Sequence, residues 1–335
     1  MHITRETLLK IAKDTVTKQL RTRHDIISIF MVGSLLTDEQ LLGGTSDIDL
    51  VFIHDRQPDV ELEIIRLSPE ITLDIAHQPQ SEYNQPLHLR LHPWIGPAIH
   101  DSHIVLYDTQ HWFEFTQASV TSQFYLPENV FARAHQGIER ARQIWLEMQM
   151  NPGEPGKSLI NYLKAVEAGA NAAASLTGAP LTERRFLLNF PERARAINRP
   201  GLTNGLLSLI GADQIEPGQI KSWLPAWHEA YQSQSDNERR QIRLHLDRRL
   251  YYERAIEALL ASEMPAAALW PLLNTWAEVD YYQSPESPTQ KDWPGVIQSL
   301  HLGGDQFTGK LEALDAYLDT VEEILDDWAK SNGIA

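Results

Sequence analysis

The chain has 335 residues, a length typical of about two domains that are each large enough for a core of their own. It contains no cysteine, which excludes disulfides and thiolate metal sites and favours a reducing compartment. The formal net charge of −16 is the reverse of the basic surface with which proteins bind a nucleic-acid backbone.

The first predicted element is a helix over residues 4–23, whose apolar side chains recur at helical spacing and predict one face packed on a sheet. Residues 1–6 lack a signal-peptide pattern, and no apolar run approaches the length of a membrane span. We therefore expect a cytoplasmic protein without a membrane partner.

The next stretch predicts two strands separated by glycine turns. Residues 26–32 form an apolar strand that runs directly into Gly33-Ser34. A glycine lets a phosphate approach the backbone closely, so the amides around Ser34 are candidates for binding phosphate oxygens. Gly43-Gly44 then predicts a turn into the second strand.

This second strand carries two carboxylates, Asp47 and Asp49. Successive side chains of a strand point to opposite faces, so both carboxylates are expected on one face and the apolar residues between and after them on the other. Two like charges on a half-buried strand are costly unless a cation compensates them, and hard divalent cations prefer oxygen ligands.

A third carboxylate, Asp74, stands among apolar residues in a predicted strand over residues 70–77, which follows another predicted strand over residues 60–67. Pairing of the two acidic strands would bring Asp47, Asp49 and Asp74 together. We therefore expect these three residues to be the ligands of Mg²⁺ or Mn²⁺.

A last strand over residues 103–108 completes the predicted sheet, and Asp108 is expected to cap the helix that follows. Before this strand, His88 and His92 stand four residues apart and could share a helical face. Because no third ligand stands at a characteristic spacing, we favour ordinary histidines near a nucleotide over a zinc site.

From about residue 113 the strand pattern gives way to helical stripes joined by Pro, Gly and Asn turns. We predict an α/β domain over residues 1–115 and an all-helical bundle over residues 120–335. Helices are expected over residues 127–150, 157–176, 182–197, 202–210, 217–234, 238–262, 265–282 and 305–330.

The set Gly33-Ser34, Asp47-Ile48-Asp49 and Asp74, in this order, resembles the signature of the nucleotidyltransferase superfamily that includes DNA polymerase beta and the antibiotic nucleotidyltransferases. The resemblance covers roughly the first third of the chain. It implies a nucleotidyltransferase domain with a mixed sheet flanked by helices. It also implies transfer of a nucleoside monophosphate from a nucleoside triphosphate such as ATP to an acceptor hydroxyl, with two metal ions held by the aspartates.

The helical half resembles the C-terminal part of the kanamycin-type aminoglycoside nucleotidyltransferases, on the run from Glu167-Ala168-Gly169-Ala170 to Leu181-Thr182-Glu183-Arg184-Arg185. In that family a glutamate on the long helix is the catalytic base, and a lysine one turn later meets the phosphates. The nearest position here is Glu139, and Gln143 stands where the lysine would be.

A triphosphate also needs cations from the protein. Lys157 and Lys164, with Asn161 between them, share one face of the predicted second helix and are candidates for this contact. An equally open alternative is that the two lysines are ordinary solvent-facing residues of an amphipathic helix.

The acceptor is expected to be a small molecule, antibiotic-like, or a protein, and not a long nucleic acid, because the chain is acidic. One alternative rests on Arg240 and His245, which fit the Arg-x4-His spacing of helical ribonuclease domains that partner minimal nucleotidyltransferases in toxin–antitoxin pairs. Such a protein would act on RNA or a partner protein. A noncatalytic nucleotide-binding module is the third alternative, and the acceptor, the preferred base and the oligomeric state stay open.

Overall fold

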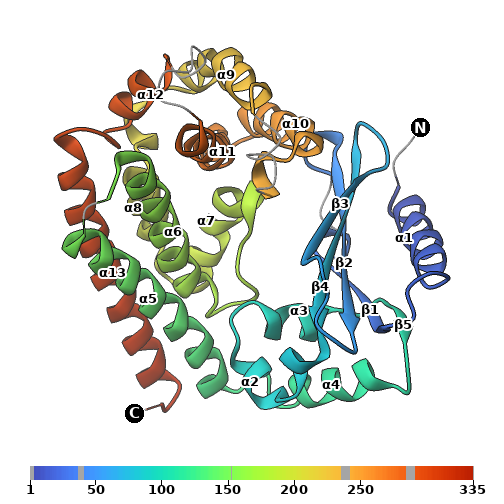
Figure 1. The fold of residues 1–335 in the computed structure, drawn as a ribbon. Coiled ribbons are helices and arrows are strands. Elements are labelled where there is room, and N and C mark those ends of the chain that lie inside the picture. Colours follow the sequence, from blue (N-terminus) through green and yellow to red (C-terminus); the bar gives the residue numbers. More distant parts are fainter. Residues whose placement is uncertain (1–3, 37–40, 152, 235–241, 284–290, 335) are drawn as a thin grey trace. The chain divides into compact units, whose positions relative to one another are not determined.

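The computed structural model describes residues 4–36, 41–151, 153–234, 242–283 and 291–334. Contacts divide the chain into two compact units, residues 1–129 and 130–335. The first unit contains the sheet and the second is helical (Figure 1). Within the described ranges, no helix combines the length and the apolar character that a membrane span requires.

The sheet of the first unit has five strands in the order β3-β4-β2-β1-β5. Strands β2 and β4 run parallel, and every other neighbouring pair is antiparallel, so the expected mixed sheet is confirmed. The strands are β1 (Ile26–Val32), β2 (Ser46–His54), β3 (Leu62–Arg66), β4 (Ile71–Pro79) and β5 (Val105–Asp108).

Helix α1 (Arg5–Gln19) covers one face of this sheet (Figure 1). Its N-cap is Thr4, whose hydroxyl accepts a hydrogen bond from the Thr7 amide at 3.2 Å. The apolar stripe of α1 packs against the alternate residues of β2 and β4 that point to this side: Leu8, Ala12 and Val16 meet Ile48, Leu50, Leu73 and Ile75.

The opposite face of the sheet is covered by α2 (Pro86–Leu91), α3 (Ile95–Asp101) and α4 (Trp112–Thr121). Asp108 caps α4 as expected, because its two carboxylate oxygens accept from the amides of Phe113 and Glu114 at 2.9 and 3.2 Å. Helix α4 belongs to the first unit. The change from strand patterns to helical stripes in the sequence begins at this helix and therefore precedes the boundary between the units.

The second unit is built from helices of up to 26 residues. They are α5 (Pro127–Met150), α6 (Pro155–Ala174), α7 (Phe186–Ala196), α8 (Gly201–Leu209), α9 (Pro217–Gln232), α10 (Arg249–Leu260), α11 (Leu269–Tyr282), α12 (Trp293–Ser299) and α13 (Gln306–Ser331). Their order agrees with the predicted helical bundle.

One predicted helix, over residues 238–262, is wrong in its first half. Residues 235–241 lie outside the described part of the chain, and the two segments that follow, Ile242–Leu244 and Leu246–Arg248, are separate 3-10 turns. His245 separates them because its ψ of 130° is extended, and its side chain caps the second turn. The α-helix begins only at Arg249.

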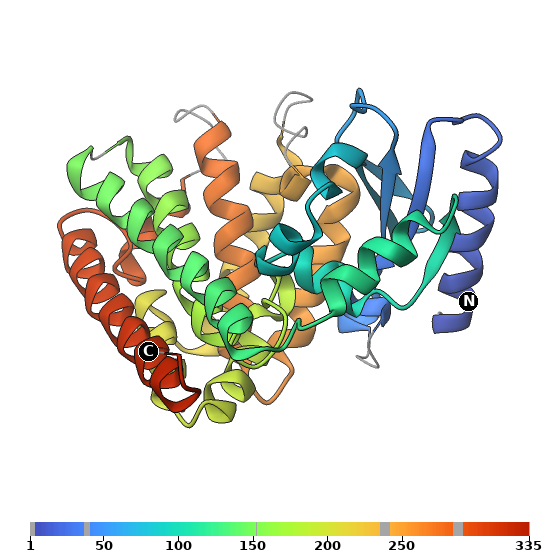
Figure 2. The same cartoon turned by 90° about the horizontal axis from the view of Figure 1, so that it is seen from below.

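Helices α5 and α13 lie side by side (Figure 2) and are joined by Arg142. Its guanidinium donates to Asp315 at 2.5 Å, to Asp319, and to both oxygens of Glu322 at 2.8 and 2.9 Å. These partners raise the pKa of Arg142 above its ordinary value, led by the hydrogen bonds to Glu322. Arg142, which precedes Gln143 in the sequence, therefore pairs with α13.

Candidate metal centre

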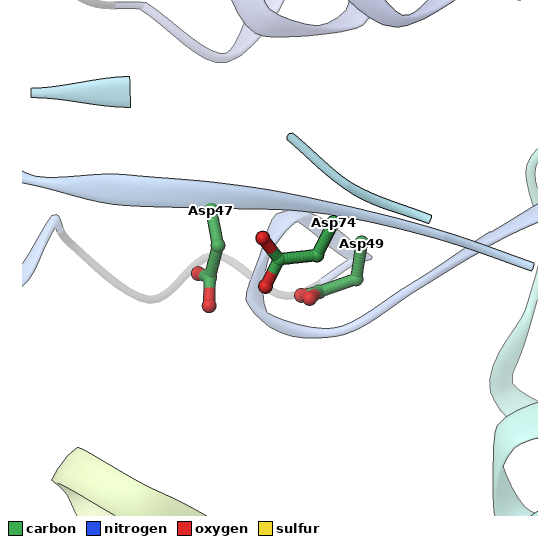
Figure 3. Close-up of side chains that lie close together, drawn as sticks. All are labelled: Asp47, Asp49 and Asp74. Carbon is green, nitrogen blue, oxygen red and sulfur yellow. The ribbon is translucent and has the colours of Figure 1, made fainter. Parts of the chain in front are cut away.

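The parallel register of β2 and β4 brings the three aspartates together. Asp49 of β2 stands directly beside Asp74 of β4, and Asp47 stands two residues earlier on the same face of β2. One carboxylate oxygen from each residue lies within 4.8 Å of the others. Figure 3 shows all three carboxylates on one side of the strands and close to one another. The predicted convergence of the acids is confirmed.

The aspartates lie where solvent reaches them only in part. Asp47 is 8% exposed and Asp74 is 5% exposed, while Asp49 is half-buried. Three buried or half-buried carboxylates at this separation repel one another unless protons or a cation compensate them. The donor set consists of oxygen alone, which is the set that Mg²⁺ and Mn²⁺ prefer.

Gly33 lets the turn after β1 pass against Asp49. Its φ of 82° lies in the left-handed region, where glycine alone is unstrained. A Cβ at this position would clash with the Asp49 carboxylate, lying 2.9 Å from its Cγ. The register places this turn beside the aspartate because Val32 pairs with Asp49 across β1 and β2. Ser34 follows in a short 3-10 turn, half-buried.

A second glycine turn leads the chain into β2. Gly43 and Gly44 have φ values of 64° and 71°, and no atom lies within 4 Å of where a Cβ on Gly44 would stand. After this turn the Ser46 amide donates to the Glu70 carbonyl at 2.9 Å, which fixes the start of β2 beside β4. The turn thus sets the register that the aspartates depend on.

The other predicted site residues lie in the second unit. Glu139 of α5 has a side chain that is 64% exposed, and it pairs with His135 one turn earlier at 3.5 Å. Lys157 and Lys164 of α6 are exposed, and Asn161 between them is half-buried. The roles assigned to these four residues stay predictions.

His92, which follows α2, has a structural contact, whereas His88 is exposed. The Nδ1 atom of His92 accepts from the amides of Trp94 and Ile95 at 3.2 and 3.0 Å, so this ring caps α3. Burial lowers the pKa of His92, which keeps the ring neutral. In the part of the chain that the structure describes, the aspartate group is the one cluster with metal-ligand geometry, and His88 is outside it.

A charged cluster in the second unit was missed by the sequence reasoning. Arg243 donates to Glu183 at 2.9 Å and to Glu278 at 2.7 Å, and the Tyr252 hydroxyl donates to the second oxygen of Glu183 at 2.8 Å. Glu183 has a left-handed φ of 43°, which is unusual for a residue with a side chain. These residues come from four separate segments, so no local spacing reveals them.

Glu167 of α6 lies at the edge of this cluster. Burial raises the pKa of its carboxyl to about 7, the charge of Arg243 opposes the rise, Glu183 adds to it, and Lys164 opposes it. One feature of the sequence could have drawn attention to Glu167: it is a charged residue within the run of small residues 165–174 of α6. Within that run, Gly169 has no room for a Cβ, which would lie 2.5 Å from Leu318 of α13.

Comparisons with known proteins do not assign the chain to a family. Neither the protein-family models nor the curated proteins gave a match. The functional argument therefore rests on the geometry of the aspartates and on the motifs around them.

Proposed function

We propose that the protein is a metal-dependent nucleotidyltransferase. The observation that carries this proposal is the group formed by Asp47, Asp49 and Asp74, with oxygens within 4.8 Å of one another beside the Gly33 turn. The order of these motifs resembles the signature of the nucleotidyltransferase superfamily, and that resemblance implies a mixed sheet flanked by helices, which supports the proposal. The first unit would then be its catalytic domain.

The three aspartates fit divalent cations by their chemistry, because they offer oxygen donors and a high local negative charge. When bound, such cations supply charge stabilisation to the phosphate oxygens of a displacement. Asp47 and Asp49 would hold them, and Asp74 would complete the second position and orient the acceptor hydroxyl or take its proton. Asp74 is suited to this because it stands directly beside Asp49.

The nucleoside triphosphate would be held by the turn after β1. Backbone amides that follow a glycine in the left-handed region can point at one anion, and Gly33 and Ser34 would supply such amides next to Asp49. Lys157, Asn161 and Lys164 remain the proposed further contacts to the triphosphate. Glu139 remains a proposed base, and it is exposed and paired with His135.

The proposed acceptor is a hydroxyl of a small molecule or of a protein. A net charge of −16 opposes the neutralisation of a nucleic-acid backbone. The RNA-directed alternative gains nothing from the described residues: Arg240 lies outside them, and the Nδ1 atom of His245 accepts from the Asp247 amide at 3.3 Å.

Two measurements test the proposal. Calorimetry with Mg²⁺ or Mn²⁺ and each of ATP, GTP, CTP and UTP should detect binding to the native protein and none to Asp49→Asn. Incubation of the protein with triphosphates labelled at the α-phosphate and a cell extract should then label an acceptor. Metal and nucleotide binding without any labelled product would favour the noncatalytic module, and the absence of metal binding would overturn the proposal.

A further inference from the structure

A chain of buried polar side chains lies on the sheet face opposite the aspartates. His54 at the end of β2 and His77 on β4 are 3% and 4% exposed. Both point to the face that α1 covers, since they alternate with the residues that point to the other side. Three charged residues surround them: Asp25 before β1, Glu63 on β3, and Arg23 in the connection from α1 to β1.

The contacts run in one line. Asp25 Oδ2 lies 3.0 Å from His54 Nδ1, and His54 Nε2 lies 2.8 Å from His77 Nδ1. At the other end, one Arg23 nitrogen lies beside the His77 ring, 3.3 Å from Nε2 and 3.5 Å from Nδ1. Glu63 Oε1 lies 3.3 Å from the same Nε2 atom. Arg23 also donates to Glu63 directly.

Hydrogen-bond chemistry fixes the protons along this line. A carboxylate only accepts, so His54 must carry its proton on Nδ1 to donate to Asp25. His54 Nε2 then accepts, and the proton between the rings belongs to His77 Nδ1. In a neutral ring His77 Nε2 is therefore bare, and it can accept from Arg23, which only donates.

The same nitrogen has two incompatible neighbours at one distance. Arg23 requires His77 Nε2 to be bare, whereas Glu63 requires it to carry a proton. We propose that this pair of contacts is a proton-operated switch, in which protonation of His77 exchanges Arg23 for Glu63 as the partner of its Nε2 atom. No covalent bond changes, and the proton comes from solvent.

Burial of the His77 ring keeps it neutral, and so bound to Arg23, at neutral pH. Burial lowers the pKa of His77 to about 4, Glu63 opposes this, and Arg23 and His54 add to it. Burial alone would raise the pKa of Asp25, but the hydrogen bonds from His54 and from its own backbone leave it lowered, with help from the charges of His54 and Arg56. Arg56 approaches Asp25 at 3.6 Å and is largely exposed.

The exchange acts on the connection between α1 and β1. The Arg23 amide donates to the carbonyl of Gln19, the last residue of α1, at 3.0 Å. Arg23 therefore belongs to the turn that directly follows α1. Its guanidinium in turn reaches β3 and β4. Protonation of His77 removes one of the bonds that tie the end of α1 to the sheet, and it places a second positive charge beside the guanidinium.

Nuclear magnetic resonance of the full chain with ¹⁵N-labelled histidine tests the proposal without any substitution in the first step. We expect both His54 and His77 to carry their protons on Nδ1 at pH 7. As the pH falls below 5, His77 should gain a proton on Nε2. A proton on His77 Nε2 at pH 7 would overturn the proposal.

Two substitutions give a sharper test because they should act in opposite directions. Arg23→Gln removes the positive donor, so the midpoint of the His77 titration should rise by at least one pH unit. Glu63→Gln removes the negative charge that stabilises the protonated ring, so the midpoint should fall. Arg21→Gln, at an exposed position of the same connection, is the matched control and should leave the midpoint unchanged. A shift of the same sign in both variants would contradict the exchange.

Discussion

The carboxylates of Asp47, Asp49 and Asp74 repel one another in the absence of a cation, since their oxygens lie within 4.8 Å. We therefore expect Asp47→Asn and Asp49→Asn to abolish metal binding and transfer, while the metal-free protein unfolds at the same temperature or a higher one. The free energy of unfolding of the metal-free protein should rise by about 1 kcal/mol or less. Asp74→Asn should behave in the same way.

Differential scanning calorimetry with and without Mg²⁺ measures this effect. Asp59→Asn, which removes an exposed carboxylate from the connection between β2 and β3, is the control and should retain the metal-dependent rise in melting temperature. A marked fall in the metal-free melting temperature for all three site variants would identify the aspartates as structural residues.

Gly33 makes two separate contributions that a pair of substitutions can distinguish. Gly33→Ala forces a side chain into the left-handed region and against Asp49, whereas Gly44→Ala meets the backbone strain alone. We expect Gly44→Ala to cost about 1 kcal/mol and to keep metal affinity. Gly33→Ala should cost more and weaken Mn²⁺ binding about tenfold or more, which a Mn²⁺ titration checks. Equal metal affinity in both variants would contradict the assigned role of Gly33.

At the scale of the elements, Arg142 supplies the ion pairs between α5 and α13, beside a hydrogen bond from Trp145 to the Leu311 carbonyl at 3.0 Å. Arg142 is 19% exposed and meets three acids of α13 that are 40–63% exposed, so water screens the pairs in part. We expect Arg142→Met to destabilise the second unit by about 1–2 kcal/mol, because it leaves three carboxylates of one helix face without their cation.

Urea denaturation at low salt and in 1 M NaCl checks this expectation. The loss of stability in Arg142→Met should be smaller in high salt. Salt screens the attraction between Arg142 and the acids in the unmodified protein, and it screens the repulsion among the acids in the variant. Arg140→Met on the same helix, where the arginine makes an exposed contact with Gln143, should have little effect. A loss that is independent of salt would indicate that Arg142 acts by packing.

The elements that the sequence predicted correctly are those with a local signal. In the strand with Asp47 and Asp49, apolar and acidic residues alternate, which indicates the two faces of the strand. Asp108 stands before the first residues of α4, a position that indicates a helix cap. The extended break at His245 has no such signal, because the residues around it, Arg243 to Arg248, fit a helical stripe as well.

The residues of the candidate site were predicted because their order along the chain resembles the signature of a known superfamily. Local pattern placed Asp49 and Asp74 on strands, but not on adjacent strands. Their adjacency depends on a parallel register that local pattern does not encode. The same limit applies to His54 and His77, which lie 23 residues apart and meet only in the sheet, and to the ion pairs of Arg243 with Glu183 and Glu278.

At the scale of the whole molecule, His77 in the first unit and Glu167 in the second should make stability depend on pH in opposite directions. The pKa of His77 in the first unit falls from 6.5 to about 4 on folding, so its contribution to stability is complete above pH 6.5 and is lost as the pH falls towards 4. The pKa of Glu167 in the second unit rises from 4.5 to about 7, so its contribution is complete below pH 4.5 and is lost as the pH rises through 7.

Calorimetric scans of Glu167→Gln from pH 4.5 to pH 8 test the contribution of Glu167. This variant should melt at a higher temperature than the unmodified protein at pH 8 and show much less of an advantage at pH 4.5, where the glutamate is already protonated in the folded state. Glu192→Gln, at an exposed position of the same unit, should follow the unmodified protein at both pH values. An advantage that is equal at both would contradict the assignment.

The acidity of the whole chain leads to a prediction about nucleic acids. Each phosphate contact steepens the dependence of log affinity on log salt by about 0.7–0.9, and a chain at −16 has few arginine or lysine clusters to supply such contacts. We expect tRNA and single-stranded RNA to bind more weakly than micromolar at physiological salt in a filter-binding assay. Tight binding with a steep salt slope, or labelled RNA as the product in extract, would favour the RNA-directed alternative.

The strand order β3-β4-β2-β1-β5 also determines when the metal centre can exist during folding. Strands β3 and β4 form one hairpin, β1 and β2 form another antiparallel pair, and the parallel contact between β4 and β2 is the seam that joins them. The aspartates stand on both sides of this seam, so its closure brings like charges together. A cation bound by the three aspartates would make that closure favourable. If the proposed metal is Mg²⁺, it should slow the separation of the two pairs and protect the amides of β4 from hydrogen exchange.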